Sequence, residues 1–201
     1  MNNVLCLSDP VVKQLRREHP AFKGTRLLKR GMFCGVFSMP SPDRVLKLTT
    51  DRSHSGYLTD WCAPKGDYKP MVLEDYGQVA ETQAGDLPLH LLEVERLFPV
   101  RRGSPNAKLV TRLIKFTDRM PNFPEDLSGL DVAPALKMFL EELTWFIGNY
   151  DCKLDTGRNN FMERADGTLV FSDPTFDYKL RDRVERDRRT YARAHLSPIS
   201  F

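Results

Sequence analysis

The first half of the chain contains short runs in which apolar residues alternate with polar ones, which is the pattern of half-buried β-strands. In the run RVLKLT, at residues 44–49, Val45 and Lys47 fall on one face of the predicted strand. Leu46 and Leu48 fall on the other face. The alternation therefore predicts a strand that carries a single lysine on an otherwise apolar, inward side.

Other segments show apolar residues at helical spacing. Residues 133–150 predict a core helix, because their apolar positions recur every three or four residues. These positions are Leu136, Phe139, Leu140, Leu143, Phe146 and Ile147. An N-terminal helix over residues 9–19 is predicted by Asp9 as its cap and Pro10 in its first turn. Shorter helices are predicted over residues 53–62, 107–117 and 179–193.

Glycine and proline mark the turns between the predicted strands. Residues 31–39 predict a strand-turn-strand hairpin that contains Gly31 and Gly35. Residues 39–43, which include two prolines, predict the turn into the lysine-bearing strand. Residues 87–97 predict a further buried strand that exits into polar residues.

The segment KLDTGRNNFMERADGTLVFSDPTF, at residues 153–176, contains the most specific chemical pattern. Asp155 is followed five residues later by Asn160, and Asp173 comes after two short strands joined by an Asp-Gly turn. Phosphoryl transfer from Mg-ATP uses this set: an aspartate accepts the proton of the substrate hydroxyl, and an asparagine and a second aspartate hold Mg²⁺ through oxygen. We therefore expect Asp155 to be catalytic and Asn160 and Asp173 to be metal ligands.

Features upstream complete the order expected of an ATP-binding site. Gly31 and Gly35 correspond to the loop that covers the phosphates, and Lys47 corresponds to the catalytic lysine that pairs with them. Each feature taken alone is also typical of an ordinary hairpin or a buried strand. Their occurrence in the kinase order, ahead of Asp155, favours ATP and Mg²⁺ as the cofactors.

The strand at residues 87–97 corresponds to the hinge of protein kinases, whose exit binds adenine through backbone groups. We expect Val94 at the gatekeeper position, Glu95 next to it and Leu97 two residues further on. An ordinary buried strand followed by a loop would have the same local sequence.

Composition narrows the class of protein. The net charge of the 201-residue chain is +3, which is too small to indicate a nucleic-acid partner. The four cysteines and four histidines are scattered, which disfavours zinc and disulfide frameworks and favours a reduced cytosol. There is no signal-peptide pattern and no apolar run of about 18 residues. We therefore expect a soluble protein with no membrane partner.

The combination of G-x-x-x-G, RVLKL, DTGRNNFM and SDPTF resembles the early serine/threonine kinase of T-odd podophages, the Teseptimavirus group of the protein-kinase-like superfamily. The resemblance covers residues 31–176 and implies an α+β, minimal bilobal protein-kinase-like fold in a single domain. An antiparallel N-lobe sheet and hinge would occupy about residues 1–97, and a reduced helical C-lobe about residues 98–201. The chain ends soon after this region, so we expect it to lack the basic segment that relatives use for transcriptional shutoff.

The resemblance also implies a biological role. It implies an early phage protein in the host cytoplasm that phosphorylates host proteins, including components of transcription or translation, and also itself. Ser197, in the polar segment at the end of the chain, is a candidate autophosphorylation site on grounds of access alone.

Departures from the protein-kinase pattern lead to further expectations. Leu154 stands before Asp155 where many kinases have arginine, and Pro174 and Thr175 replace the usual Phe-Gly after Asp173. We therefore expect a permanently arranged site that is not controlled by an activation loop. The predicted helix at residues 53–62 contains no glutamate, so the partner of Lys47 is expected to be Asp60 or Glu74.

Two other functions fit parts of the pattern. A pseudokinase-like binder that inhibits a host factor is favoured by the missing partner of Lys47 and disfavoured by the intact set of metal ligands. A small-molecule phosphotransferase of the aminoglycoside-kinase type uses the same Asp and Asn spacing but carries a larger helical lobe.

The tail at residues 179–193 is rich in arginine, and acidic residues interleave with the arginines. This pattern favours a solvated or packed helix over a nucleic-acid surface. Docking of a substrate is the alternative, because guanidinium groups suit acidic partners.

Overall fold

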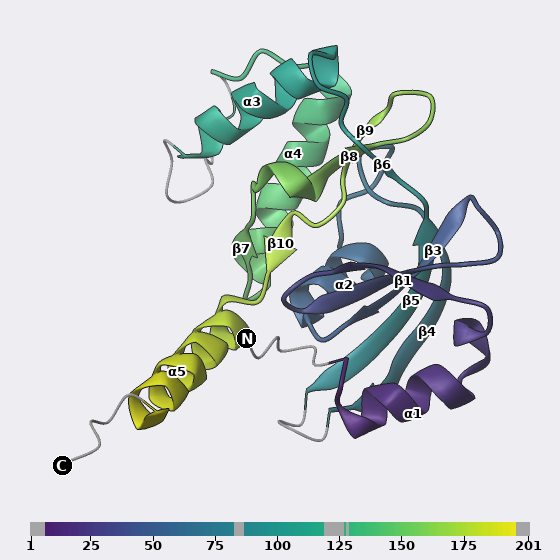
Figure 1. The fold of residues 1–201 in the computed structure, drawn as a ribbon. Helices are drawn as coiled ribbons and strands as arrows, with labels where there is room; N and C mark the ends of the chain where they lie inside the picture. The colour runs from purple at the N-terminus through teal and green to yellow at the C-terminus, as the bar shows by residue number, and fades with distance from the viewer. Residues whose placement is uncertain (1–6, 83–86, 119–126, 128, 196–201) are drawn as a thin grey trace.

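The fold is a mixed α+β arrangement in which an antiparallel sheet is followed by helices and short strands (Figure 1). The computed structural model describes residues 7–82, 87–118, 127 and 129–195. The main sheet has the order β1-β2-β3-β5-β4, and each neighbouring pair is antiparallel. Its strands are β1 (Arg26–Arg30), β2 (Cys34–Ser38), β3 (Arg44–Thr49), β4 (Val72–Glu81) and β5 (Pro88–Glu95). The α+β class and the antiparallel sheet expected from the sequence are confirmed.

The two faces of the sheet pack against different clusters of residues, and successive side chains of β3 contribute to opposite faces, as its alternation predicts. Leu46 and Leu48 are completely buried in a cluster that also contains Val12 of α1 (Pro10–Glu18). Val45 belongs to a second cluster, which includes residues of α2, α3 and α4. The predicted division of β3 into two faces is confirmed.

Helix α1 begins where its sequence predicts. The carboxylate of Asp9 accepts the N–H of Val11 at 2.9 Å, and Pro10 occupies the first turn. A short 3₁₀ helix, η1 (Pro20–Phe22), follows and leads into β1.

Helix α2 (Arg52–Thr59) follows β3 almost directly. Asp51 caps it, because one carboxylate oxygen accepts the N–H groups of Ser53 at 2.9 Å and His54 at 3.2 Å. The helix ends before the predicted limit at residue 62. Beyond its end, Asp60 accepts the N–H of Cys62 at 2.9 Å, which is a turn and not a helical contact.

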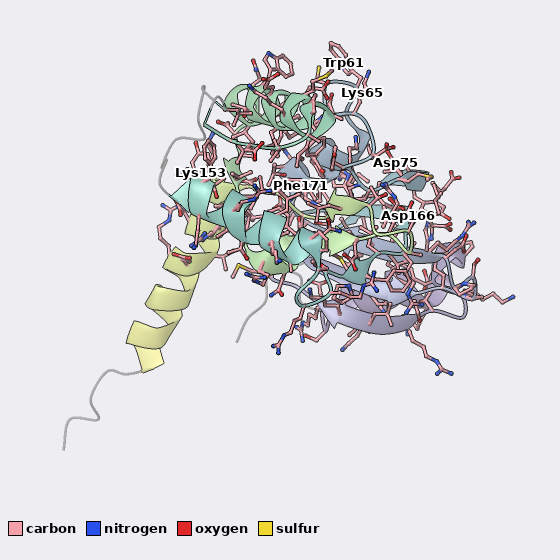
Figure 2. All side chains as sticks on the ribbon, turned by 90° about the horizontal axis from the view of Figure 1, so that it is seen from above. Trp61, Lys65, Asp75, Lys153, Asp166 and Phe171 are labelled. Carbon is pink, nitrogen blue, oxygen red and sulfur yellow. The ribbon has the colours of Figure 1, made fainter. Side chains whose placement is uncertain are left out.

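The second half of the chain contains α3 (Pro105–Asp118), α4 (Pro134–Asn149) and α5 (Tyr178–His195). Helix α4 is the predicted core helix. Its fully buried positions are Leu136, Phe139, Leu140, Leu143 and Phe146, while Ile147 is half-buried. Helix α5 extends away from the rest of the molecule in both views (Figures 1 and 2).

Short strands connect these helices. One small sheet has the order β6-β8-β9, and a second pairs β7 with β10. The expected Asp-Gly hairpin is the β8–β9 pair, and Gly167 adopts a φ of 91° in its turn. The elements are β6 (Phe98–Pro99), β7 (Lys153–Leu154), η2 (Arg158–Asn160), β8 (Phe161–Glu163), β9 (Leu169–Phe171) and β10 (Thr175–Phe176).

Specific polar contacts join the two halves of the chain. The hydroxyl of Tyr57 on α2 donates to the carbonyl of Phe171 at 2.9 Å, in the middle of the molecule (Figure 2). The guanidinium of Arg164, from the β8–β9 hairpin, lies 2.6 Å from the carboxylate of Glu95 at the end of β5. These contacts fix the β8–β9 hairpin against α2 and the main sheet.

Within the described residues, no helix is both long and apolar enough to cross a lipid bilayer. Ser197, the candidate autophosphorylation site, lies outside the described residues.

Candidate functional site

A cavity of about 620 Å³ is lined by residues of the main sheet and by segments from the second half of the chain. All the predicted site residues except Gly35 line this cavity. They are Gly31, Lys47, Val94, Glu95, Leu97, Asp155, Asn160 and Asp173. The fold therefore brings together residues that the sequence separates widely.

The position of Gly35 on β2 explains why it does not line the cavity. Gly35 pairs with Leu48 across the β2–β3 ladder, whereas its neighbours Cys34 and Val36 line the cavity. Paired residues in adjacent strands point to the same face. Gly35 therefore faces the apolar cluster that contains Leu48, on the opposite side of the sheet from the cavity.

Gly31 lies at the turn between β1 and β2. Its N–H donates to the carbonyl of Cys34 at 2.8 Å. A Cβ atom at this position would come within 2.9 Å of the Cys34 sulfur, closer than such contacts normally allow. The absence of a side chain thus lets the turn close tightly over the cavity.

Residues 155–160 form a compact loop that carries two of the predicted site residues. Oδ1 of Asp155 accepts the N–H of Gly157 at 3.0 Å. The Nδ2 atom of Asn160 donates to the carbonyl of Asp155 at 3.2 Å. With its nitrogen used in this way, Asn160 has its side-chain oxygen available for a cation, and the exposed Asp155 keeps Oδ2 for a substrate.

Backbone hydrogen bonds connect this loop to the segment around Asp173. The N–H of Asp155 donates to the carbonyl of Pro174 at 2.7 Å, next to the pairing of β7 with β10. Ser172 donates twice to the carbonyl of Asn160, from its N–H at 2.8 Å and from its hydroxyl at 3.0 Å. Asp155, Asn160 and Asp173 are therefore held in fixed relative positions by the main chain.

Two basic side chains face Asp173. Nδ1 of His54 lies 2.5 Å from Oδ1, and Nζ of Lys47 lies 3.8 Å from Oδ2. Burial alone would raise the pKa of Asp173, but the charges of His54 and Lys47 outweigh it and hold that pKa well below its usual range. Asp173 is therefore an anionic carboxylate at neutral pH, as a metal ligand must be.

The ion pair of Lys47 with Asp173 corrects the expectation that its partner is Asp60 or Glu74. Asp60 bonds to Cys62 beyond the end of α2, and Glu74 is exposed on β4. The reason is the position of α2: the helix starts directly after β3, so its first turn lies at the cavity. That turn contributes the completely buried His54 and contains no acid.

The exit of β5 is fixed by contacts of Glu95. Its carboxylate accepts from Arg164 at 2.6 Å and from the N–H of Met71 at 2.8 Å, and its own N–H donates to the Met71 carbonyl at 3.0 Å. None of the described residues hydrogen-bonds to the backbone of Leu97. Leu97 lines the cavity together with Val94, and its backbone donor and acceptor have no partner among the described residues.

The cavity also contains residues that the sequence analysis did not identify. His54 is one, and its ring Nε2 is buried without a hydrogen-bond partner among the described residues. Arg181 and Glu185, in the first turns of α5, also line the cavity, and their side chains bond to each other at 3.1 Å. The interleaved charges of the tail predict the helix, but the direction in which it leaves β10 depends on tertiary packing.

Two residues of the cavity, Asn160 and Asp173, are of the types that could hold a magnesium ion. Magnesium is usually held by one or two carboxylates together with substrate phosphates and water. The ionised Asp173 and the free oxygen of Asn160 supply such a partial set of ligands. Clusters of three or more His, Cys, Asp or Glu are not found among the described residues, and magnesium does not require one.

Comparisons with known proteins return no match: no family model, no curated protein and no solved structure is similar to this chain.

Proposed function

We propose that the protein is a Mg-ATP-dependent serine/threonine protein kinase of minimal bilobal form. The observation that carries this proposal is the convergence of Lys47, Asp155, Asn160 and Asp173 on one cavity. These are the residue types that phosphoryl transfer from ATP requires. The volume of about 620 Å³ lies within the range of small-molecule sites.

The order of elements around the cavity supports this proposal. Lys47 lies on the third strand of the sheet, which is followed by α2, and Asp155 and Asn160 lie in the loop that follows the core helix α4. Protein kinases carry the phosphate-binding lysine on their third strand and the base and asparagine in a catalytic loop. In this scheme the main sheet is the N-lobe, and the elements from α3 onward are a reduced C-lobe.

The residues of the cavity then have separate roles. Asp155 orients the substrate hydroxyl and accepts its proton as the oxygen bonds to the γ-phosphorus of ATP. The bond from that phosphorus to its bridging oxygen breaks, and ADP leaves with the electron pair. Lys47 binds the phosphate oxygens, while Asn160 and Asp173 hold Mg²⁺, which when bound neutralises charge on the phosphates.

Contacts at the rim of the cavity position the nucleotide in the same scheme. The free backbone groups of Leu97 suit the hydrogen-bonding edge of adenine, and Val94 beside them suits its apolar faces. The tight turn at Gly31 brings backbone close to the phosphates, as a covering loop does. The side chain of Glu95 fixes the hinge through Arg164 and does not need to contact the nucleotide.

The resemblance to podophage kinases extends the proposal to a biological role. On that basis the kinase acts early in infection, in the host cytoplasm, on proteins of transcription or translation and on itself. The main-chain link from Asp155 to Pro174 supports a site that is arranged without activation-loop phosphorylation.

Incubation with Mg²⁺ and γ-labelled ATP, alone and with bacterial lysate, tests the proposal. The wild-type protein is expected to label itself or lysate proteins. The Asp155→Asn variant is expected to lower labelling by about 10²- to 10⁴-fold while still binding ATP, because only proton transfer is lost. The matched control is Asp166→Asn, at the tip of the β8–β9 hairpin (Figure 2), where an amide oxygen can still accept the N–H of Thr168.

Each contrary result identifies another function. A wild-type protein that binds ATP and labels no protein would support the pseudokinase-like binder, which the absence of an acid from the first turn of α2 favours. Label that enters only small molecules of the lysate would support a small-molecule phosphotransferase.

A further inference from the structure

A second hollow lies beside the catalytic loop. It is an open groove of about 390 Å³ lined by Arg102, Gly103, Ala107, Lys108, Thr111 and Arg158, and we call it the basic groove. Arg158 belongs to η2, and the next two residues of η2, Asn159 and Asn160, line the main cavity. The basic groove and the cavity therefore lie on two sides of the loop that begins at Asp155.

The basic groove carries uncompensated positive charge. The side chains of Arg102, Lys108 and Arg158 are exposed, and none of them forms an ion pair with a described residue. Glu163, a buried carboxylate nearby in the fold, already accepts from Arg101 at 3.4 Å and from Asn106 at 3.1 Å. The groove therefore offers three cationic groups and no acid among the residues that line it.

The groove is also held in place relative to the catalytic loop. Nη2 of Arg158 donates to the hydroxyl of Thr111 on α3 at 2.9 Å, which leaves the other guanidinium N–H groups free. The hydroxyls of Thr117 and Thr156 join the same two segments at 3.2 Å. The basic groove therefore keeps a fixed distance from Asp155, and the positive end of the α3 dipole adds to its potential.

We infer that the basic groove binds an acidic segment of the protein substrate, next to the serine or threonine that is phosphorylated. This inference rests on the proposed kinase function. Guanidinium groups pair bidentately with carboxylates, so two arginines and a lysine suit Asp or Glu side chains that flank the acceptor. A nucleic-acid strand fits less well, because none of the lining residues is aromatic and stacking on bases is therefore missing.

The acidic segment is defined by its anionic side chains, which carboxylates or phosphoryl groups can provide. Three fluorescent peptides of equal length separate these sources: a serine flanked by Asp and Glu, the same peptide with Asn and Gln, and the same peptide with flanking phosphoserines. Their affinities for the full-length protein are measured by fluorescence anisotropy without ATP, so that no phosphoryl transfer is needed.

The test variant is Arg102→Gln/Lys108→Gln/Arg158→Gln. The matched control is Lys13→Gln/Arg17→Gln/Lys23→Gln, which makes the same change of charge at exposed positions of α1 and the turn after η1. The wild-type protein is expected to bind at least one anionic peptide about tenfold more tightly than the neutral one at low salt, and to lose this difference at about 0.5 M salt. The test variant is expected to lose the difference, and the control to keep it.

Several results would overturn the inference. These are equal affinity of the wild-type protein for all three peptides, an equal loss in the test and control variants, or a preference for a single-stranded oligonucleotide that the test variant abolishes. The two proposals can be told apart: binding of anionic peptides without any labelled protein would refute the kinase, and with it the substrate role of the groove, and would keep only the anion-binding site. Labelled protein without a preference for anionic peptides would refute the groove and keep the kinase.

Discussion

Neighbouring residues of β3 face two very different environments. Leu46 and Leu48 have no exposed surface and pack in the apolar cluster that includes α1. Lys47, between them, faces the cavity with 8% of its surface exposed, 3.8 Å from the carboxylate of Asp173. One strand thus supplies stability on one face and charge on the other, because its side chains alternate.

The two faces have opposite energetic effects. Burying the leucines stabilises the fold in proportion to the apolar surface removed from water. Burying the charge of Lys47 costs free energy, and its ion pair with Asp173 offsets that cost. The apolar face of β3 therefore provides the stability that allows charged groups to be buried on the opposite face.

The largest effect is expected on the free energy of unfolding, from a substitution in the apolar face of β3. Leu46→Ala removes a completely buried side chain, so the free energy of unfolding should fall by about 2–5 kcal/mol. Leu27→Ala, on an exposed position of β1, is the control and should change it by less than about 1 kcal/mol. Urea unfolding measures both changes. If Leu46→Ala were as mild as the control, the apolar face would not be the one that stabilises the sheet.

The next largest effect is expected on the rate of phosphoryl transfer, from removing the charge of Lys47 on the opposite face of β3. Lys47→Met keeps most of the apolar stem and removes the charge, so phosphoryl transfer should fall by about 10²- to 10³-fold. The midpoint of urea unfolding should move far less than in Leu46→Ala. Lys23→Met, at an exposed position, serves as the control for both measurements. A variant that unfolds as easily as Leu46→Ala but transfers phosphate normally would show that Lys47 has a structural role.

The same comparison explains what the sequence could predict. Lys47 was predicted to face inward because alternation is a local property of a strand. Asp155, Asn160 and Asp173 were predicted together because they lie close in sequence, and the expected β8–β9 hairpin lies between the last two. Gly35 was expected at the cavity because the spacing of two glycines does not show which face each occupies. The register of β2 with β3 decides that.

Residues that come from other elements were harder to predict. His54 reaches Asp173 because α2 starts directly after β3, and no local pattern marks the distance between a first helical turn and a distant carboxylate. Arg181 and Glu185 line the cavity because of the direction in which α5 leaves β10. Pairing of Lys47 with Asp173 follows from the same tertiary approach, which the search for a nearby acid could not reveal.

A smaller effect is expected at His54. Its substitution should change the affinity for Mg²⁺, through Asp173, separately from the free energy of unfolding. His54→Leu removes the group next to Asp173, so the Mg²⁺ concentration for half-maximal activity should rise by about tenfold. The substitution also removes a buried ring nitrogen that has no partner among the described residues. The substitution also removes the ion pair with Asp173, so the two contributions to the free energy of unfolding oppose each other, and the net change should be smaller than in Leu46→Ala.

The control for His54→Leu is a conservative replacement. His54→Asn keeps a nitrogen close to the position of Nδ1 and should restore much of the affinity for Mg²⁺. Titration of activity with Mg²⁺ and urea unfolding of each variant separate positioning from stability. An unchanged Mg²⁺ requirement in His54→Leu would show that Asp173 does not depend on this contact for its position.

The smallest effect is expected at Gly157, inside the loop at residues 155–160 that we propose to be catalytic. A Cβ atom there would lie 3.1 Å from Oδ1 of Asp155, so Gly157→Ala presses on that carboxylate, and it would be in ordinary contact with Nδ2 of Asn160 at 3.5 Å. The rate of phosphoryl transfer should fall by roughly tenfold or less, because a small displacement of positioned groups costs rate before it costs stability. Gly148→Ala, in α4 with no atom within 4 Å of the added Cβ, is the control and should stabilise the helix slightly. Steady-state kinetics at saturating ATP measure the change. An unaltered rate in Gly157→Ala would mean that the loop at residues 155–160 adjusts to the added methyl group. Phosphoryl transfer at the charged face of β3 would then not depend on close packing within this loop.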